Sequence, residues 1–386
     1  MSGGRLRIAV LVNDFGPPWD EAGKNNARAV AAALAGRHDV VCVGLGAAGG
    51  EERVEGLRAM RCGSPFYRSS WKRLFYPFGY LNLIWRGAEL LEDFRPQVLL
   101  CFWETASTAL PAAALRALAA PEARLIQVVW TDSYQLEAAS PAVWLSEHLP
   151  NLLFNGELVT RIAIRQVDCV VATSRYLAGR MRAAGAREVV VGGHGVDVER
   201  FAPGPASAPR PRPVVGYLGH ATHAKGLGVL LEALGPAAAR GELELALALS
   251  DSPEAAALER AALPGVRFAG YCPPEEFYSG CDLLVFPRIS SYGTASYPNA
   301  VLEAMACGRC VLTTRQPAID EIVREGETGF LVEPGDATAL RERALALLAD
   351  EGKRRSVGDS ARAFVLSELS WPRALEPLVR LLEREE

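Results

Sequence analysis

Short apolar runs alternate with polar, turn-rich loops and with stretches of helix-forming residues along most of the chain. Apolar runs of this kind, bounded by turn residues, are typical of buried strands. In the first half, strands are expected at residues 7–13, 39–44, 98–102, 125–130, 168–173 and 189–191. In the second half, they are expected at residues 214–218, 243–249, 281–287 and from 310 onward. Helices are expected near residues 25–35, 157–166, 227–234, 300–306 and 370–383, and Ser174 is expected to cap one more. Strands that alternate with helices in this order predict parallel α/β sheets.

A proline-rich stretch divides the chain. Residues 203–213 hold five prolines among small residues, a composition that makes a stiff linker. At 386 residues, the chain is long enough for two domains with separate cores. The predicted domains are therefore residues 1–205 and 206–368, followed by a terminal helical segment at 369–386.

Composition and charge exclude several classes of protein. Hydrophobic residues make up 49% and charged residues 22% of the chain, as in ordinary globular proteins. The net charge of −4 gives no reason to expect a nucleic-acid partner. The apolar run at the amino terminus is too short for a signal peptide or a membrane span, so a cytoplasmic protein is expected. The histidines and cysteines show no spacing that predicts a metal site. Cys307 and Cys310 form a C-x-x-C at a helix end, which favours a structural role over a redox role.

The clearest functional pattern lies between residues 281 and 312. A buried-type strand ends near Pro287, a turn-rich loop follows, and helix formers begin at Ala300. Open α/β sheets bind ligands outside the carboxyl ends of their strands, and the amino terminus of a helix attracts anions such as phosphate. Glu303, one turn into this helix, can accept hydrogen bonds from sugar hydroxyls. The alternative for a lone glutamate is that it only complements the helix dipole.

The segment SYPNAVLEAMACG at residues 296–308 resembles the signature loop and helix of the retaining glycosyltransferases of family 4. The resemblance implies the GT-B fold, in which two Rossmann-like parallel-sheet domains face each other across a cleft and a C-terminal helix crosses back to the first domain. Glu303 matches the second glutamate of the family pattern, which binds the ribose of the nucleotide, whereas the first glutamate falls on Ala295 and is absent. The implied donor-binding residues here are Ser296, Tyr297, Pro298, Asn299, Ala300 and Glu303, with Tyr271 as a stacking candidate for the base.

A second part of the resemblance is GHATHAKG at residues 219–226. The family pattern at this point is Gly-Arg, four residues, then Lys-Gly, and its arginine and lysine clamp the donor diphosphate. Gly219 and Lys225 match this pattern, but His220 stands at the position of the arginine. An imidazolium donates to phosphate only when it is protonated, and it lacks the two-pronged fork of a guanidinium. The resemblance therefore implies a clamp that is weaker or more sensitive to pH. The alternative for Lys225 is a solvated loop lysine.

The first half offers candidates for the acceptor side. Gly23 and Lys24 lie in a loop similar to the family's Pro-Pro-x-x-Gly-Gly loop, in which one glycine still permits close approach of the backbone. Trp130, Asp132 and Tyr134 follow the expected strand at 125–130 and could line a sugar site. The alternatives are a plain strand-to-helix loop for Gly23 and Lys24, and ordinary packing for the aromatic residues.

Residues 66–86 have an unusual composition, with eight aromatic residues, four basic residues and no acidic residue. One interpretation is a helix whose aromatic side chains line the core and the acceptor cleft. The other is a peripheral contact with the inner face of a membrane, where a lipid-linked acceptor could be reached.

The combined interpretation is a cytoplasmic, bacterial-type glycosyltransferase of glycan biosynthesis. It would move a sugar from a nucleotide-diphosphate donor to an acceptor hydroxyl with retention, using Lys225, His220 and Glu303 as catalytic residues and neither cofactor nor metal. The acceptor stays open among a glycan, a lipid-linked sugar and a small molecule. Ala295 and His220 also fit an inactive protein that kept the fold as a binding protein or partner subunit. A nucleotide-sugar epimerase is a further alternative, although the loss of a carboxylate at Ala295 argues against it.

Overall fold

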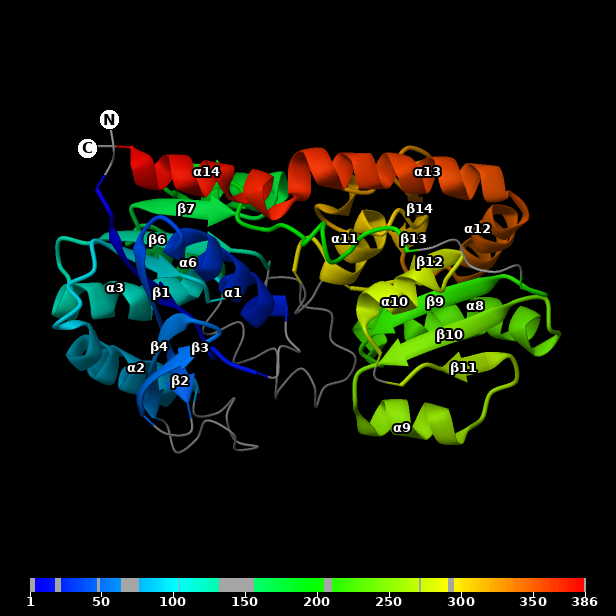
Figure 1. Ribbon diagram of the computed structural model, residues 1–386, viewed down its shortest axis with the longest axis horizontal. Coiled ribbons are helices and arrows are strands. Elements are labelled where there is room, and N and C mark those ends of the chain that lie inside the picture. The colour runs from blue at the N-terminus through cyan, green and yellow to red at the C-terminus, as the bar shows by residue number, and fades with distance from the viewer. Residues whose placement is uncertain are drawn as a thin grey trace. The chain divides into compact units, whose positions relative to one another are not determined.

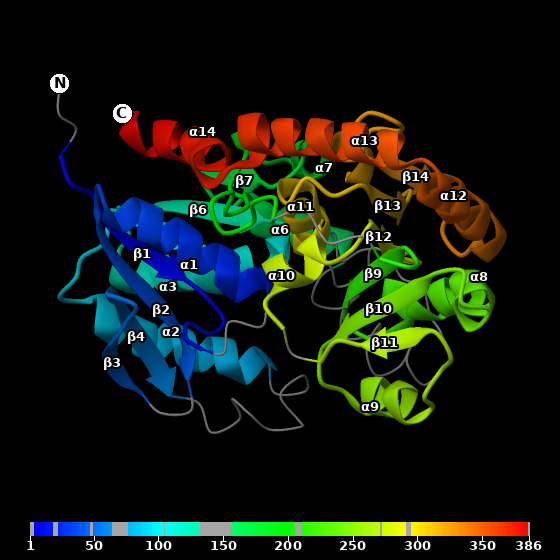
Figure 2. The same ribbon diagram turned by 45° about the vertical axis from the view of Figure 1, so that its right-hand side comes forward.

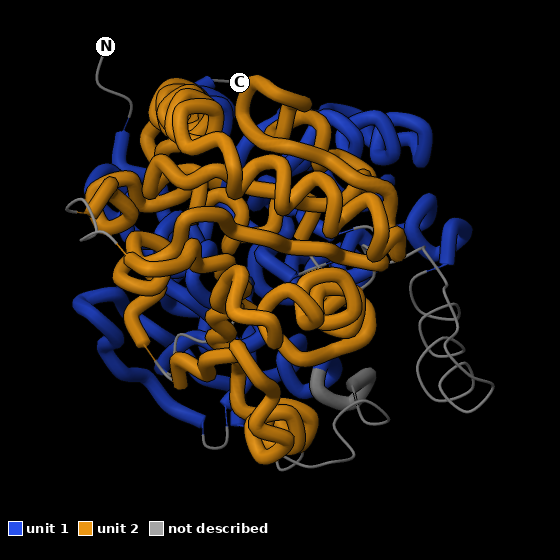
Figure 3. The backbone as a smooth tube through the Cα atoms, turned by 90° about the vertical axis from the view of Figure 1, so that its right-hand side faces the viewer, with its two compact units in different colours: residues 1–194, 375–386 blue, residues 195–374 orange. Residues whose placement is uncertain are grey.

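The computed structural model describes residues 4–17, 22–46, 49–63, 76–103, 105–131, 156–204, 210–270, 272–290 and 295–384. The chain forms two compact units, each with its own sheet (Figure 3). The first unit comprises Met1–His194 together with Leu375–Glu386, and the second comprises Gly195–Ala374. The division thus falls before the proline-rich stretch, and residues 195–204 belong to the second unit.

The first unit is built on an eight-stranded sheet in the order β3-β4-β2-β1-β5-β6-β7-β8. Its strands are β1 (Arg7–Leu11), β2 (Asp39–Gly46), β3 (Gly50–Val54), β4 (Leu57–Gly63), β5 (Val98–Cys101), β6 (Arg124–Val129), β7 (Cys169–Ala172) and β8 (Val189–Val191). All neighbours are parallel except β3 and β4, which form an antiparallel hairpin at the edge. Its turn residues, Glu55 and Gly56, have φ values of 51° and 84°, as a two-residue hairpin turn requires. The sequence analysis missed this hairpin because β3 is almost entirely polar and exposed.

Helices cover both faces of the first sheet. They are α1 (Ala22–Ala35), α2 (Tyr76–Leu91), η1 (Ala106–Thr108), α3 (Ala109–Ala119), α6 (Glu157–Ile164) and α7 (Arg175–Ala184). One core joins alternate residues of the strands to α2, α3, α6 and α7, while Val30 and Leu34 bury the apolar face of α1. Ser174 accepts a hydrogen bond from the Leu177 N–H at 3.2 Å, which confirms the expected cap of α7.

The second unit is built on a six-stranded, fully parallel sheet in the order β11-β10-β9-β12-β13-β14 (Figure 2). Its strands are β9 (Val214–Gly219), β10 (Glu244–Leu249), β11 (Val266–Phe268), β12 (Leu283–Phe286), β13 (Val311–Thr314) and β14 (Phe330–Val332). The strand order runs outward from β9 in one direction and from β12 in the other. The loops that follow β9 and β12 therefore diverge at the point where doubly wound sheets bind their ligands.

In the second unit, a helix or helical turn follows each strand from β9 to β13, and a run of successive helices follows β14 (Figure 1). They are η3 (His223–Lys225), α8 (Leu227–Ala239), α9 (Pro253–Arg260), α10 (Pro274–Ser279), α11 (Asn299–Ala306), η4 (Ile319–Glu321), α12 (Ala337–Ala349), α13 (Glu351–Phe364), the π-helical turn η5 (Val365–Leu369) and α14 (Trp371–Glu383). Helix α8 continues past its expected end and contains Pro236, because Ala237 and Ala238 beyond the proline are buried in the core. Helix α14 begins in the second unit, and its residues from Leu375 onward belong to the first.

The cysteines are all free thiols. Burial raises the pKa of the Cys307 and Cys310 thiols to about 12, and a buried thiol with a raised pKa is chemically inert. This agrees with a structural role for the C-x-x-C. Within the described ranges, every helix is too short or too polar to cross a membrane.

Candidate functional site

The loops after β9 and β12 are held together by backbone contacts. The carbonyl oxygen of Ala224 accepts hydrogen bonds from the Ile289 and Ser290 N–H groups, at 3.0 and 3.3 Å. Gly226 has a φ of 75°, and a Cβ at this position would lie 1.7 Å from the carbonyl oxygen of Pro287. Only glycine fits both the conformation and the space. The side chains on the two loops are thereby fixed relative to one another.

Two cationic residues flank the backbone contact between these loops. Lys225 ends η3 and is half-buried, and Arg288 follows β12 and is 4% exposed. Burial, followed by the nearby charge of Arg288, lowers the pKa of the Lys225 ammonium to about 7. Burial also lowers the pKa of the Arg288 guanidinium to about 10, against an opposing effect of Tyr217. The electrostatics of this corner therefore favour an anionic ligand.

Polar side chains from β13 fix the backbone that carries Arg288. The Thr313 hydroxyl donates to the Phe286 carbonyl at 2.7 Å, and the Thr314 hydroxyl donates to the Arg288 carbonyl at 2.6 Å. The Gln316 amide donates to the Ile289 carbonyl at 3.1 Å. Both threonines are fully buried. Their side-chain hydrogen bonds attach the end of β12 to β13 in addition to the backbone hydrogen bonds of the sheet.

His220 lies apart from this buried corner. Its side chain is exposed, whereas its carbonyl oxygen accepts a hydrogen bond of 2.8 Å from the Tyr217 hydroxyl. Gly219, the last residue of β9, is half-buried beside the same tyrosine ring. The structure thus fixes the backbone at residues 219–220 and leaves the imidazole at the surface.

Helix α11 brings the signature residues to the same edge of the sheet. Pro298 is its cap residue, and Ser296, Asn299 and Ala300 are half-buried at its beginning. Tyr297 is buried, and its hydroxyl donates to Glu321 Oε2 at 2.8 Å, which gives this tyrosine a role in holding the loop.

The Glu303 carboxylate is positioned by Tyr278, a residue that the sequence analysis did not single out. The Tyr278 hydroxyl donates to Glu303 Oε2 at 2.8 Å. Burial raises the pKa of the Glu303 carboxyl to about 7, although the Tyr278 hydrogen bond and the charge of Arg200 act in the opposite direction. A carboxyl whose pKa is raised by burial is a candidate functional group, which favours a ligand-binding role for Glu303 over simple complementing of the helix dipole.

The GVDVERF segment at residues 195–201 supports this arrangement. Phe201 packs against Tyr278 with ring centroids 6.3 Å apart, and Arg200 donates to Glu275 Oε2 at 3.0 Å. Tyr278 and Arg288 left no recognisable signal in the sequence, because each acts through a contact made only in the folded chain.

Several predicted residues lie outside the described ranges: Tyr271, Asp132, Tyr134 and residues 66–75. In the first unit, the structure does bring three predicted acceptor-side residues together. Lys24 forms an ion pair of 2.7 Å with Asp14. Trp130 is 3% exposed, packs edge-on against Phe102, and would be 3.4 Å from a Cβ at Gly23. The contacts of Trp130 are those of a packed core residue.

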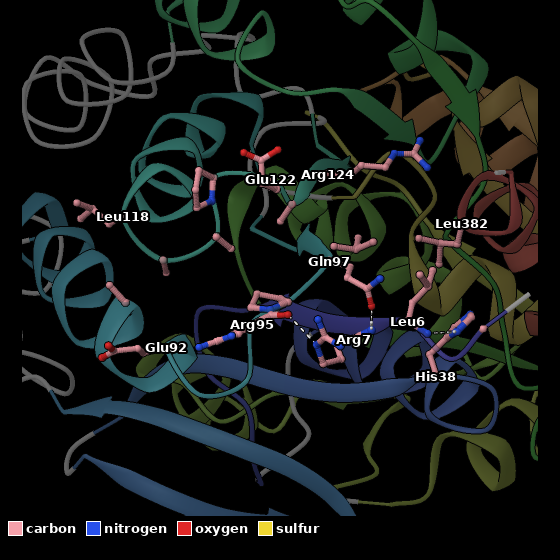
Figure 4. Close-up of a pocket in the computed structure, with 18 of the residues that line it drawn as sticks. Leu6, Arg7, His38, Glu92, Arg95, Gln97, Leu118, Glu122, Arg124 and Leu382 are labelled. Atoms are coloured by element: carbon pink, nitrogen blue, oxygen red, sulfur yellow. Dashed lines mark hydrogen bonds between the residues drawn. The ribbon is translucent and has the colours of Figure 1, made fainter. Parts of the chain in front are cut away.

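A pocket of about 1690 Å³ in the first unit lies away from these residues. It is lined by residues at the amino-terminal ends of the strands, including Arg7, Val98 and Arg124, and by α14 (Figure 4). Arg7 Nε donates to the Arg95 carbonyl at 2.8 Å there. Gly23 and Trp130 lie beyond the opposite, carboxyl ends of the strands, so this pocket is separate from the candidate residues.

Comparison with known proteins identifies the family. A model described as "Glycosyl transferases group 1" matches residues 212–350, and one described as "Glycosyl transferase 4-like domain" matches residues 24–194. The chain belongs to the group 1 glycosyltransferases and has their GT-B fold, as the sequence analysis expected.

Solved structures agree with this fold. Sucrose-phosphate synthase from Thermosynechococcus elongatus is 19% identical and superposes with a TM-score of 0.81 over 98% of both chains. Anabaena HepE in complex with UDP-glucose is 16% identical, with a TM-score of 0.69 over 98% of this chain and 99% of that one. At these identities the likeness concerns the fold.

Curated relatives match over shorter stretches. The GDP-mannose-dependent alpha-(1-6)-phosphatidylinositol monomannoside mannosyltransferase of Mycolicibacterium smegmatis is 30% identical over 240 residues, or 55% of this chain and 62% of the relative. A D-inositol 3-phosphate glycosyltransferase of Corynebacterium jeikeium is 30% identical over 214 residues, or 49% and 50%. In both cases the match spans less than two thirds of the relative's length.

Proposed function

We propose that this glycosyltransferase moves a sugar from a nucleotide-diphosphate sugar to an acceptor hydroxyl with retention at the anomeric carbon. The observation that carries the proposal is the placement of Lys225 and Glu303 at the switch point of the second sheet. Lys225 lies in the segment after β9, and Glu303 lies in α11, which follows the loop after β12. A cation for the diphosphate and a carboxylate for the ribose are the two groups that such a donor needs. The UDP-glucose bound to HepE and the GDP-mannose dependence of the mycobacterial relative support this class of donor.

The proposed reaction uses the donor's own leaving group. The bond between the anomeric carbon and the diphosphate oxygen breaks, and the acceptor oxygen forms its bond on the same face of the sugar. The acceptor proton passes to the departing diphosphate. Negative charge grows on the diphosphate as the bond breaks, so pre-placed donors such as Lys225 and the first N–H groups of α11 stabilise the transition state. Neither an enzymic nucleophile nor a metal ion is needed in this scheme.

The acceptor side of the proposal rests on the first unit. Gly23 and Trp130 lie together after the carboxyl ends of its strands, and Lys24 is oriented by Asp14. A peripheral membrane contact through residues 66–86 would suit a lipid-linked acceptor. Within the described part of that segment, Leu81 and Trp85 on α2 are 60% and 69% exposed, as side chains that contact a bilayer surface would be.

The test is thermal unfolding of the purified protein with UDP, GDP, ADP and dTDP and the corresponding sugars. A ligand at a hundred times its dissociation constant stabilises the folded state by about 2.7 kcal/mol, and the nucleotide that raises the melting temperature identifies the donor base. Lys225→Ala should abolish the shift and lower sugar transfer about a hundredfold. Lys353→Ala, at an exposed lysine of α13, should keep both.

A second candidate function is that of a binding protein or inactive subunit. It is favoured by Ala295 and by the exposed imidazole of His220, which together remove two family contacts with the donor. In that case no nucleotide sugar would shift the melting temperature, and a partner protein would be needed for transfer. A nucleotide-sugar epimerase would instead interconvert free donor sugars without an acceptor, which product analysis of the same samples distinguishes.

A further inference from the structure

Arg288 lies beside the proposed diphosphate site, but the proposed function does not yet assign it a role. It follows β12 at the carboxyl edge of the sheet, and its guanidinium is almost fully buried. Arginine is rarely buried to this degree unless its charge is paired. Its backbone is anchored by Thr314, and the N–H of the next residue, Ile289, donates to Ala224, the neighbour of Lys225. The side chain is therefore set on a rigid support next to the proposed diphosphate site.

The proximity of Arg288 to Lys225 has an electrostatic consequence. Two like charges placed together in a partly buried corner raise each other's free energy, and the positive charge of Arg288 does lower the pKa of Lys225. An anion bound at this corner removes that cost, and a diphosphate carries enough negative charge to satisfy both cations. Binding of a diphosphate at this corner would therefore offset the repulsion between Lys225 and Arg288.

The chemistry of the two candidate clamp residues differs. The His220 imidazole is exposed and is charged only when protonated. The Arg288 guanidinium stays charged at neutral pH and offers a planar fork that binds two phosphate oxygens at once.

We propose that Arg288 is the guanidinium that binds the donor diphosphate, so that the arginine missing from position 220 is replaced by one on the neighbouring loop. This inference rests on the proposed function, because it assigns a residue to the diphosphate of that donor. The inference also implies that the diphosphate clamp keeps two cations, Lys225 and Arg288, which come from two loops instead of one.

The experiment compares nucleotide affinities of Arg288 variants by isothermal titration calorimetry. The probes are UDP or GDP, whichever stabilises the wild-type protein, and the matching nucleoside, uridine or guanosine. Arg288→Met should weaken the diphosphate about tenfold to a hundredfold, as expected for hydrogen bonds to a charged group, and should leave the nucleoside affinity within about threefold. Arg288→Lys keeps the charge without the fork and should lose less. His220→Ala tests the competing position. Arg315→Met, at an exposed arginine that follows β13, is the matched control and should change neither affinity by more than about threefold.

The outcomes separate the two proposals. If the wild-type protein binds the diphosphate and Arg288→Met binds it equally well, Arg288 is a structural residue and the inference is wrong while the proposed function stands. If His220→Ala weakens binding of the diphosphate and Arg288→Met does not, the clamp is at position 220. If the wild-type protein binds none of the four nucleoside diphosphates, the proposed function fails and the inference fails with it. Should Arg288→Met not fold, as judged by circular dichroism, Arg288→Lys decides by the ratio of diphosphate to nucleoside affinity.

Discussion

Lys225 and Glu303 both have pKa values of about 7, reached from opposite directions. Burial makes the ammonium more acidic than an ordinary lysine and the carboxyl more basic than an ordinary glutamate. The proposed donor needs the charged form of each, since the ammonium pairs with phosphate and the carboxylate accepts from ribose hydroxyls. Lys225 is charged below its pKa, and Glu303 is charged above its own.

At the scale of residues, donor affinity should therefore depend on pH with a maximum near neutrality. Affinity for the nucleoside diphosphate should fall on the acid side as Glu303 is protonated, and on the alkaline side as Lys225 loses its proton. Calorimetric titration between pH 5.5 and 9, a range that extends on both sides of these pKa values, measures both limbs. Glu303→Gln should flatten the acid limb, and Lys225→Arg should flatten the alkaline limb.

Tyr278→Phe provides a sharper control for the acid limb. The Tyr278 hydrogen bond lowers the pKa of Glu303, so its removal should move the acid limb to higher pH while the alkaline limb stays in place. A limb that does not move would mean that another group titrates there.

At the scale of elements, the junction between η3 and α8 depends on one glycine. Gly226→Ala places a methyl group against the Pro287 carbonyl in a left-handed conformation, and we expect a loss of about 2–4 kcal/mol of unfolding free energy. Gly228→Ala, two residues further and inside α8, meets open space and should be neutral or stabilising by up to about 1 kcal/mol. Denaturant unfolding of the two variants checks this, and equal effects would contradict the role given to the loop contact.

The elements show what the sequence could and could not predict. The apolar runs of β9, β12 and β13 were strong enough to predict each strand, and the turn residues before Asn299 predicted where α11 begins. The hairpin of β3 and β4 was missed because an exposed edge strand needs no apolar pattern. The predicted helix at residues 227–234 ends too early. Pro236 follows it in the sequence, and only the fold shows that Ala237 and Ala238 beyond the proline are buried.

The same limit applies to the candidate site. Lys225 and Glu303 could be proposed from short motifs, since each lies at a fixed spacing from a glycine or a helix start. Arg288, Tyr278 and Asp14 could not, because each meets its neighbour across 10 or more residues of chain through tertiary contacts. A single arginine after a strand does not indicate a binding site in the sequence, because its proximity to Lys225 becomes visible only in the fold.

At the scale of the whole molecule, every described donor-side candidate belongs to the second unit. Hydrogen exchange with and without saturating nucleoside diphosphate should therefore show its largest protection at residues 219–226, 288–290 and 295–303. Backbone amides in β11 and β14, the two edge strands of the same sheet, are the internal control and should change little. Maximal protection elsewhere would place the nucleotide outside the switch point.

The division of α14 has a consequence for the way the chain is made. Leu375, Leu378, Leu381 and Leu382 are buried in the first unit, yet they are synthesised after the entire second unit. On the ribosome, the first unit can form its sheet early, but the surface that these leucines cover must wait exposed until translation has passed residue 382. Because this apolar surface stays exposed during synthesis, we expect the nascent first unit to bind chaperones. A stop codon near residue 370 would leave the surface uncovered, and we expect the amino-terminal half of that chain to aggregate.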